Sequence, residues 1–215
     1  MTFLATLDER PLVLIVDDDA AVRTSLEELM LSVGIDARGF GSTRELLDAE
    51  LPERPGCLVL DVRMPGASGL DLQQHLAATG NAKPIVFLTG HGDIPMTVQA
   101  MKAGAVDFLT KPFRDQSLLD AVTAGIERDV ARRADAALVK QQSDRYATLT
   151  VRERQVLAEV ARGRLNKQIA FDLGITEVTV KLHRSAVMKK MRAASIGELI
   201  RAWDLLPPEL RERTT

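Results

Sequence analysis

The chain has 215 residues, 46% of them hydrophobic and 27% charged, a composition that allows one large globular domain or two small ones. Its apolar runs are all shorter than the ~18 residues of a membrane span and it begins with no secretion signal, so we expect a cytoplasmic protein. The single cysteine, Cys57, excludes an internal disulfide and a cysteine-cluster metal site. Because Cys57 precedes an apolar run, we expect it to be a small core residue.

Charge is distributed unevenly, although the net charge is only −2. Residues 1–124 hold 10 Lys and Arg against 18 Asp and Glu, and residues 145–215 hold 14 against 8. The stretch between them holds 4 of each kind. An acidic part joined to a basic part predicts two modules, and the basic one is a candidate for contact with nucleic acid.

The acidic part alternates short apolar runs with stretches of helical spacing. The apolar runs predict strands at 12–16, 35–40, 57–61, 84–89 and 106–111. The stretches between them predict helices at 20–33, 43–49, 69–79 and 94–103, with a fifth from about residue 115. This alternation predicts an α/β fold with a doubly wound parallel sheet, whose functional site lies beyond the carboxyl ends of the strands.

Polar side chains follow the ends of these strands. Asp17, Asp18 and Asp19 follow the first strand, and Asp61, Thr89 and Lys111 end later strands, so three carboxylates, a hydroxyl and an ammonium are expected to converge there. Each alone would be an ordinary solvated loop residue. Together, close carboxylates repel one another, and a hard divalent cation such as Mg²⁺ relieves the repulsion by taking oxygen ligands. The lysine adds a mobile positive charge to the same edge.

Four ordered motifs resemble the receiver domain of two-component response regulators. They are VDDD at 16–19, LDVRMPG at 60–66, LTGHGD at 88–93 and FLTKPF at 108–113. The resemblance covers roughly the first 125 residues and implies a (βα)5 fold with strand order 2-1-3-4-5. It also implies that Asp61 accepts a phosphoryl group from a sensor histidine kinase.

The resemblance further implies a magnesium site. Asp18 and Asp61 would bind Mg²⁺ directly, Asp17 would act through water, and the backbone carbonyl of Arg63 would complete the protein ligands. Aspartate-based phosphatases have a DxD pattern, with an acidic residue two positions after the first aspartate. In this chain the residue two positions after Asp61 is Arg63. The sequence also lacks GxxxxGK[ST] and GxGxxG nucleotide loops, so we expect a regulator rather than an enzyme.

Other roles implied by the resemblance concern the phosphoryl group and its signal. Thr89 would donate a hydrogen bond to a phosphoryl oxygen, and Lys111 would pair with the phosphate. Thr89 and Phe108 would form the switch, although simple core packing also accounts for Phe108. The Lys111–Pro112 peptide would be cis, and residues 94–120 would form a signalling surface whose output is dimerisation.

A connection follows the acidic part. Leu118, Val122, Ile126 and Val130 recur every four residues, and no proline interrupts residues 115–145. This pattern is compatible with one continuous helix. A flexible solvated linker is the alternative, because a charge-rich helix without a packed face is marginal alone.

The basic part begins with a helix over 149–163 with Thr150 as N-cap, followed by helix, Gly174 turn and helix. Thr176 is the expected N-cap of the last of these. Helical spacing places Val180, Val187 and Met191 on one side and Val178, Leu182, Ser185 and Lys189 on the other. The first set is expected in the core. The second set is exposed among basic residues and suits DNA bases and phosphates.

This part resembles the LuxR-type helix-turn-helix, so the whole chain resembles a response regulator of the NarL/FixJ type. The resemblance implies a four-helix domain whose helix from about Glu177 to Arg192 enters the major groove. The candidate DNA contacts are Thr179, Lys181, Leu182, Arg184, Ser185 and Lys189. His183 fits packing or a backbone contact as well as base reading. The family often has serine where this chain has Leu165, so capping there passes to Asn166 or is weaker.

The last predicted helix covers 195–206, with a Ser195/Glu198 capping box at its start and Pro207 and Pro208 ending it. Its apolar stripe predicts Ile196, Leu199 and Ile200 in the core. Trp203 packs on the same core or meets a second subunit.

We therefore expect a receiver domain at 1–125, a helical linker at 126–147 and a DNA-binding domain at 148–215. Phosphorylation with Mg²⁺ would control dimerisation or interdomain contacts, and through them transcription. The expected partners are a histidine kinase, promoter half-sites in double-stranded DNA and a second copy of the chain, with RNA polymerase as a further candidate. The alternatives are a phosphorylation-independent DNA-binding regulator that dimerises through its receiver, and an aspartyl-phosphate hydrolase.

Overall fold

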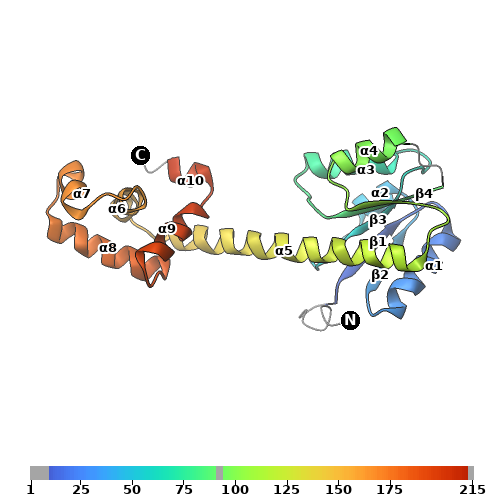
Figure 1. Cartoon of the computed structure of the whole chain (residues 1–215), viewed down its shortest axis with the longest axis horizontal. Helices are drawn as coiled ribbons and strands as arrows, with labels where there is room; N and C mark the ends of the chain where they lie inside the picture. The colour runs from blue at the N-terminus through green and yellow to red at the C-terminus, as the bar shows by residue number, and fades with distance from the viewer. Residues whose placement is uncertain (1–9, 91–93, 213–215) are drawn as a thin grey trace. The chain divides into compact units, whose positions relative to one another are not determined.

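The computed structural model describes residues 10–90 and 94–212. The chain divides into two compact units, Met1–Arg133 and Ala134–Thr215. Helix α5 (Asp115–Ala147) belongs partly to each (Figure 1). In the described part of the chain, no helix is both long enough and apolar enough to cross a lipid bilayer.

The first unit is built on a five-stranded parallel sheet. Its strands are β1 (Leu12–Val16), β2 (Asp36–Phe40), β3 (Leu58–Asp61), β4 (Ile85–Thr89) and β5 (Asp107–Thr110). They pair in the order β2-β1-β3-β4-β5, and every pair is parallel. The predicted doubly wound sheet and its strand order are confirmed. All residues of β1, β3 and β4 are buried, as expected for strands covered on both faces.

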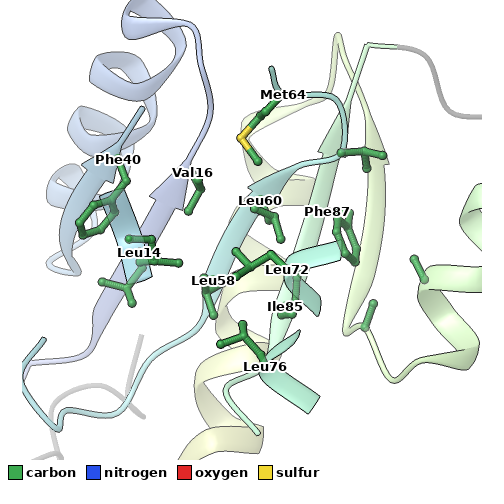
Figure 2. Packing of buried hydrophobic residues seen from close by; sticks show 14 of the residues in the cluster. Leu14, Val16, Phe40, Leu58, Leu60, Met64, Leu72, Leu76, Ile85 and Phe87 are labelled. Carbon is green, nitrogen blue, oxygen red and sulfur yellow. The ribbon is translucent and has the colours of Figure 1, made fainter. Parts of the chain in front are cut away.

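Helices cover both faces of this sheet. They are α1 (Ala20–Ser32), α2 (Thr43–Asp48), α3 (Gly69–Ala78), α4 (Ile94–Lys102) and the first part of α5. Leu14, Leu58, Leu60 and Phe87 lie in one cluster of buried side chains (Figure 2). The same cluster contains Leu46 of α2, Leu72 and Leu76 of α3, and Ala100 of α4. The alternate residues of the same strands pack toward α1 and α5 on the other face. The strand ends are therefore fixed by two apolar layers.

Cys57 lies in the second of these layers. Its side chain is fully buried, which confirms the expected core position. Burial raises the pKa of the Cys57 thiol to about 12, because the interior disfavours a thiolate.

Helix α5 runs without interruption over 33 residues. Leu118, Val122 and Ile126 are fully buried against the sheet, and Val130 packs at the edge of the same core. The helical alternative for the connection is thus confirmed. The helix begins with a packed apolar face, which overcomes the cost of nucleating its charged continuation.

The second unit is all helical. After the end of α5 it contains α6 (Val151–Ala161), α7 (Asn166–Leu173), α8 (Glu177–Met191), α9 (Ile196–Asp204) and the short α10 (Pro208–Glu212). Four of these helices were predicted. Helix α10 is additional, because Pro207 and Pro208 indicate the end of the preceding helix but proline is also well suited to the first turn of a new one.

Local signals fix most helix ends in this unit. Thr150 and Glu153 form a reciprocal capping box at the start of α6, and Thr176 caps α8 as predicted. Gly174 ends α7 in the left-handed conformation, with φ of 64°. Gly174 and Thr176 therefore fix the turn between α7 and α8.

Two predictions for α9 are wrong in part. Leu199 is 1% exposed and Ile200 is half-buried, but Ile196 is 48% exposed and lies outside the core, because it occupies the solvent-facing first turn. Ser195 accepts a hydrogen bond from the Glu198 N–H, as expected of an N-cap. The Glu198 carboxylate accepts from the N–H of Ala194 instead of Ser195, so the capping box is not reciprocal.

Candidate functional site

The carboxyl ends of the central strands bring the predicted polar side chains together. Asp17 follows β1, Asp61 and Thr89 are the last residues of β3 and β4, and Lys111 follows β5. The Lys111 N–H donates to the Thr89 carbonyl at 2.7 Å, which extends the β4–β5 pairing to the lysine. The parallel register alone therefore places these residues at one edge.

Three carboxylates form a cluster at this edge. Oxygen atoms of Asp17, Asp18 and Asp61 all lie within 4.8 Å of one another. Asp17 and Asp61 are buried, whereas Asp18 is exposed. An oxygen-only donor set with one solvent-exposed member fits Mg²⁺, which prefers carboxylate oxygens and keeps several waters.

Asp19 does not join the cluster. Its carboxylate accepts hydrogen bonds from the N–H groups of Ala21 and Val22 and forms the N-cap of α1. Its position directly before α1 assigns this side chain to the helix cap and not to the acidic edge.

Lys111 neutralises part of the acidic cluster. Its ammonium donates to Oδ2 of Asp17 at 2.5 Å and to Oδ2 of Asp61 at 2.9 Å. Burial acts to lower the pKa of Lys111, but the hydrogen bonds and charges of the two aspartates outweigh it and raise that pKa above its ordinary value. The side chain is thus charged and held between two strands.

The backbone around Asp61 is equally constrained. Its Oδ1 accepts a hydrogen bond from the Arg63 N–H at 3.1 Å. A Cβ at Gly69 would come within 2.3 Å of the Asp61 carbonyl oxygen, so only glycine fits where α3 begins. Sequence reasoning missed Gly69; its place directly after the N-cap Ser68 was the available signal.

The two proposed switch residues lie on neighbouring strands, Thr89 at the end of β4 and Phe108 on β5. Thr89 is fully buried, and Phe108 is half-buried with its ring centroid 6.0 Å from that of Phe87. The Lys111–Pro112 peptide is cis, as the resemblance implied. In the LTGHGD motif, residues 91–93 lie outside the described residues.

A second candidate surface lies on α8. Val180, Val187 and Met191 are buried as predicted, and the opposite side carries Val178 and Leu182, 66% and 67% exposed. Four of the six candidate DNA contacts are exposed: Lys181, Leu182, Ser185 and Lys189. The buried side therefore presents these residues outward on a fixed helix.

The other two candidates are half-buried and already hydrogen-bonded. Thr179 Oγ1 lies 2.9 Å from Thr176 Oγ1, and Arg184 donates to Oδ1 of Asn166 at 2.6 Å. Since Asn166 binds Arg184, it does not cap α7. The N-cap is Leu165, which has no side-chain acceptor, and only its backbone N–H is satisfied, by Gln168.

Comparisons with known families agree with this geometry. Residues 13–123 match the response regulator receiver domain, and residues 147–203 match the bacterial regulatory proteins of the luxR family. The chain belongs to the response regulators of the NarL/FixJ type. The first unit is accordingly its receiver domain, and the second holds its LuxR-type DNA-binding domain.

Full-length relatives match almost the whole of this response regulator. Nodulation protein W of Bradyrhizobium diazoefficiens is 53% identical over 92% of this chain and 87% of its own length. TodT of Pseudomonas putida is 46% identical over 94% of this chain and 89% of its own length. The solved structure of the response regulator StyR, 47% identical, covers 91% of this chain and 99% of its own with a TM-score of 0.82. The solved structure of full-length FixJ from B. japonicum is 39% identical and covers 91% of this chain and 96% of its own, with a TM-score of 0.55.

Proposed function

We propose that Asp61 is the phosphoacceptor of this response regulator and that its phosphorylation by a sensor histidine kinase controls DNA binding. The observation that carries the proposal is the position of Asp61. Its carboxylate ends a buried strand, lies among two further carboxylates and receives one hydrogen bond on each oxygen, from Arg63 N–H and Lys111. Such a carboxylate is held in a fixed orientation at the carboxyl edge of the sheet, where parallel α/β folds carry their functional sites.

In the proposed transfer, an Asp61 oxygen attacks the phosphorus of a phosphohistidine in line. The new bond is phosphorus to aspartate oxygen, and the phosphorus–nitrogen bond breaks and leaves the electron pair on the kinase imidazole. Lys111 would pair with the phosphoryl oxygens. Asp17, Asp18, Asp61 and the Arg63 carbonyl would hold Mg²⁺, which when bound supplies further positive charge to those oxygens.

Thr89 is the proposed receiver of the signal. A phosphoryl group on Asp61 would accept a hydrogen bond from the Thr89 hydroxyl, and movement of that side chain would make room for Phe108. Phe108 lies on β5 beside α4, within the proposed signalling surface of residues 94–120. Dimerisation through this surface is the proposed output, with residues 126–147 as the connection.

DNA binding is assigned to residues 148–215. Leu182 would contact thymine methyl groups, while Lys181 and Lys189 would pair with phosphates and Ser185 with bases or phosphates. Thr179 and Arg184 would contribute after exchanging their internal partners. Two copies would bind paired half-sites of a promoter, where RNA polymerase is a further partner.

The test uses the full-length chain with Mg²⁺ and a small phosphodonor. Intact mass, oligomer size and retention on promoter DNA are followed for the wild type and for Asp61→Asn. We expect the mass to rise by one phosphoryl group and dimers and DNA retention to increase in the wild type only. Unchanged mass would remove the proposed mechanism, and equal DNA binding in both proteins would favour a phosphorylation-independent regulator. Rapid phosphate release without DNA binding would indicate a hydrolase.

A further inference from the structure

A cavity lies at the end of the receiver sheet opposite the acidic cluster. It has a volume of about 250 Å³ and is lined by the segment leading into β4, the C-terminal half of α3, the turn before β5 and one residue of α5. These segments meet the amino ends of the parallel strands, whereas Asp61 lies at the carboxyl ends. The cavity is therefore separate from the proposed phosphorylation site.

The charged residues of this cavity are both cationic. Lys83 and Arg128 line it, and no carboxylate does. Lys83 is half-buried, and within residues 10–90 and 94–212 its ammonium makes no hydrogen bond or ion pair. Arg128 donates from Nη1 to the Gly104 carbonyl at 3.2 Å, which leaves its Nε and Nη2 hydrogens directed elsewhere.

The carboxylate of Asp129 attracts the Lys83 ammonium, but both of its oxygens already accept hydrogen bonds from other groups. Oδ1 of the buried Asp129 accepts from Arg132 at 2.7 Å, and its Oδ2 accepts from Arg133 at 2.8 Å and from the Gly56 N–H at 3.1 Å. Burial lowers the pKa of Lys83, and the attraction of Asp129 only partly offsets this. Because Arg132, Arg133 and the Gly56 N–H occupy its oxygens, Asp129 forms no hydrogen bond with Lys83.

Neutral polar groups complete the lining. Gln73 donates from Nε2 to the Ala100 carbonyl at 3.2 Å, which joins α3 to α4, and Asn81 lies in the same lining. The volume is below the roughly 300 Å³ at which pockets for drug-sized ligands begin. Size and charge together suit a small anion.

We propose that this cavity binds a small dianion, with its negatively charged oxygens between Lys83 and Arg128. Both an aliphatic dicarboxylate and a tetrahedral oxyanion have this chemistry. The bound anion would join α3, the turn leading into β5 and α5 by charge-assisted hydrogen bonds. The receiver would then have a chemical input besides phosphorylation, at the opposite end of its sheet.

The test titrates the full-length chain, without Mg²⁺ and at low ionic strength, with succinate and with sodium sulfate. Neutral succinamide is the ligand control. Backbone amide shifts locate binding, and Lys83→Met and Arg128→Gln are compared with Lys140→Met and Arg44→Gln, which remove exposed cations paired with Asp144 and Asp48 elsewhere. Circular dichroism checks that each variant is folded.

We expect saturable shifts at Gly80, Asn81 and Gly104 with at least one of the two dianions. Affinity should fall at least tenfold in Lys83→Met and in Arg128→Gln and stay within twofold in the two control variants. The better of the two ligands identifies the dicarboxylate or the oxyanion class. The proposal is overturned if neither dianion shifts these amides more than succinamide does, or if the exposed variant Arg128→Gln binds as tightly as the wild type.

Discussion

The Lys111 ammonium lies 2.9 Å from Oδ2 of Asp61 and bonds Asp17 at the same time. The ends of three strands, β1, β3 and β5, are thereby joined by one positive charge. Any cation that enters the acidic cluster has to compete with, or add to, this ammonium.

Lys111→Met should lower the free energy of unfolding of the receiver in EDTA by about 1–3 kcal/mol, because two buried carboxylates lose a charged donor. Added Mg²⁺ should then raise the melting temperature of this variant more than that of the wild type. Far-UV circular dichroism with and without Mg²⁺ measures both effects. Lys102→Met serves as the control. An equal rise in melting temperature on adding Mg²⁺ in the wild type, Lys111→Met and Lys102→Met would contradict the prediction.

Asp18→Asn should separate metal binding from folding. Asp18 is exposed and makes no ion pair within the described residues, so its loss in EDTA should change the unfolding free energy by no more than about 0.5 kcal/mol. Mg²⁺ affinity, measured by calorimetry, should fall about tenfold or more, equivalent to about 1.4 kcal/mol. Asp19→Asn is the matched control, because asparagine is also a good N-cap and Asp19 lies outside the cluster. A similar loss in both variants would argue against Asp18 as a ligand.

Asp129→Asn should destabilise the receiver in a pH-dependent way. Burial acts to raise the pKa of Asp129, but hydrogen bonds and charges from Arg133 and Arg132 outweigh it and lower that pKa. The carboxylate therefore stabilises the fold at pH above the ordinary aspartate value of about 3.9, and this contribution is lost as pH falls through the lower folded value. We expect a cost of about 3–5 kcal/mol at pH 7. Urea unfolding at several pH values would refute this if the difference from wild type did not shrink in acid.

Leu165→Ser should stabilise the DNA-binding domain by about 0.5–2 kcal/mol. The serine hydroxyl would supply the side-chain cap that α7 lacks, and the 69% exposed leucine contributes little packing. Trp203, the single tryptophan of the chain, lies in this domain beside Tyr146, so its fluorescence in urea reports on this unit. Leu165→Ala, which removes the leucine without adding an acceptor, should not stabilise, and equal stability of the two variants would exclude the capping explanation.

Leu182→Ala and Lys189→Met should weaken DNA binding in different ways. Both residues are exposed, so neither change should alter the unfolding free energy by more than about 0.5 kcal/mol. Losing Leu182 should cost about 1 kcal/mol of affinity at sites with thymine and leave the salt dependence unchanged. Losing Lys189 should weaken binding to all sequences and reduce the salt slope by about one unit. Binding isotherms at several salt concentrations measure both, and identical slopes would remove Lys189 from the phosphate contacts.

The sheet and its acidic edge were predictable because their signals are local. Asp17 follows the apolar run at 12–16, and Thr89 ends the run at 84–89. Parallel strands bring these ends to one edge whatever the details of the helices. The predicted strands accordingly agree with the observed ones to within about one residue.

Features that depend on tertiary contacts were not predicted. The buried Asp129 contacts Gly56, which is 73 residues away, and Gly69 is required only because the Asp61 carbonyl approaches it. Ile196 matched the apolar stripe of α9, yet its first-turn position faces solvent. Periodicity identifies a helix face but not how far the core extends along it.

The burial of Cys57 has a practical consequence for experiments on this protein. It is the single thiol of the chain, fully buried and with a pKa of about 12, so maleimide reagents should leave the native protein unmodified. A cysteine introduced at an exposed position would then carry a fluorophore or spin label selectively, without first removing Cys57. Slow labelling of Cys57 itself would measure the rate at which the receiver core opens.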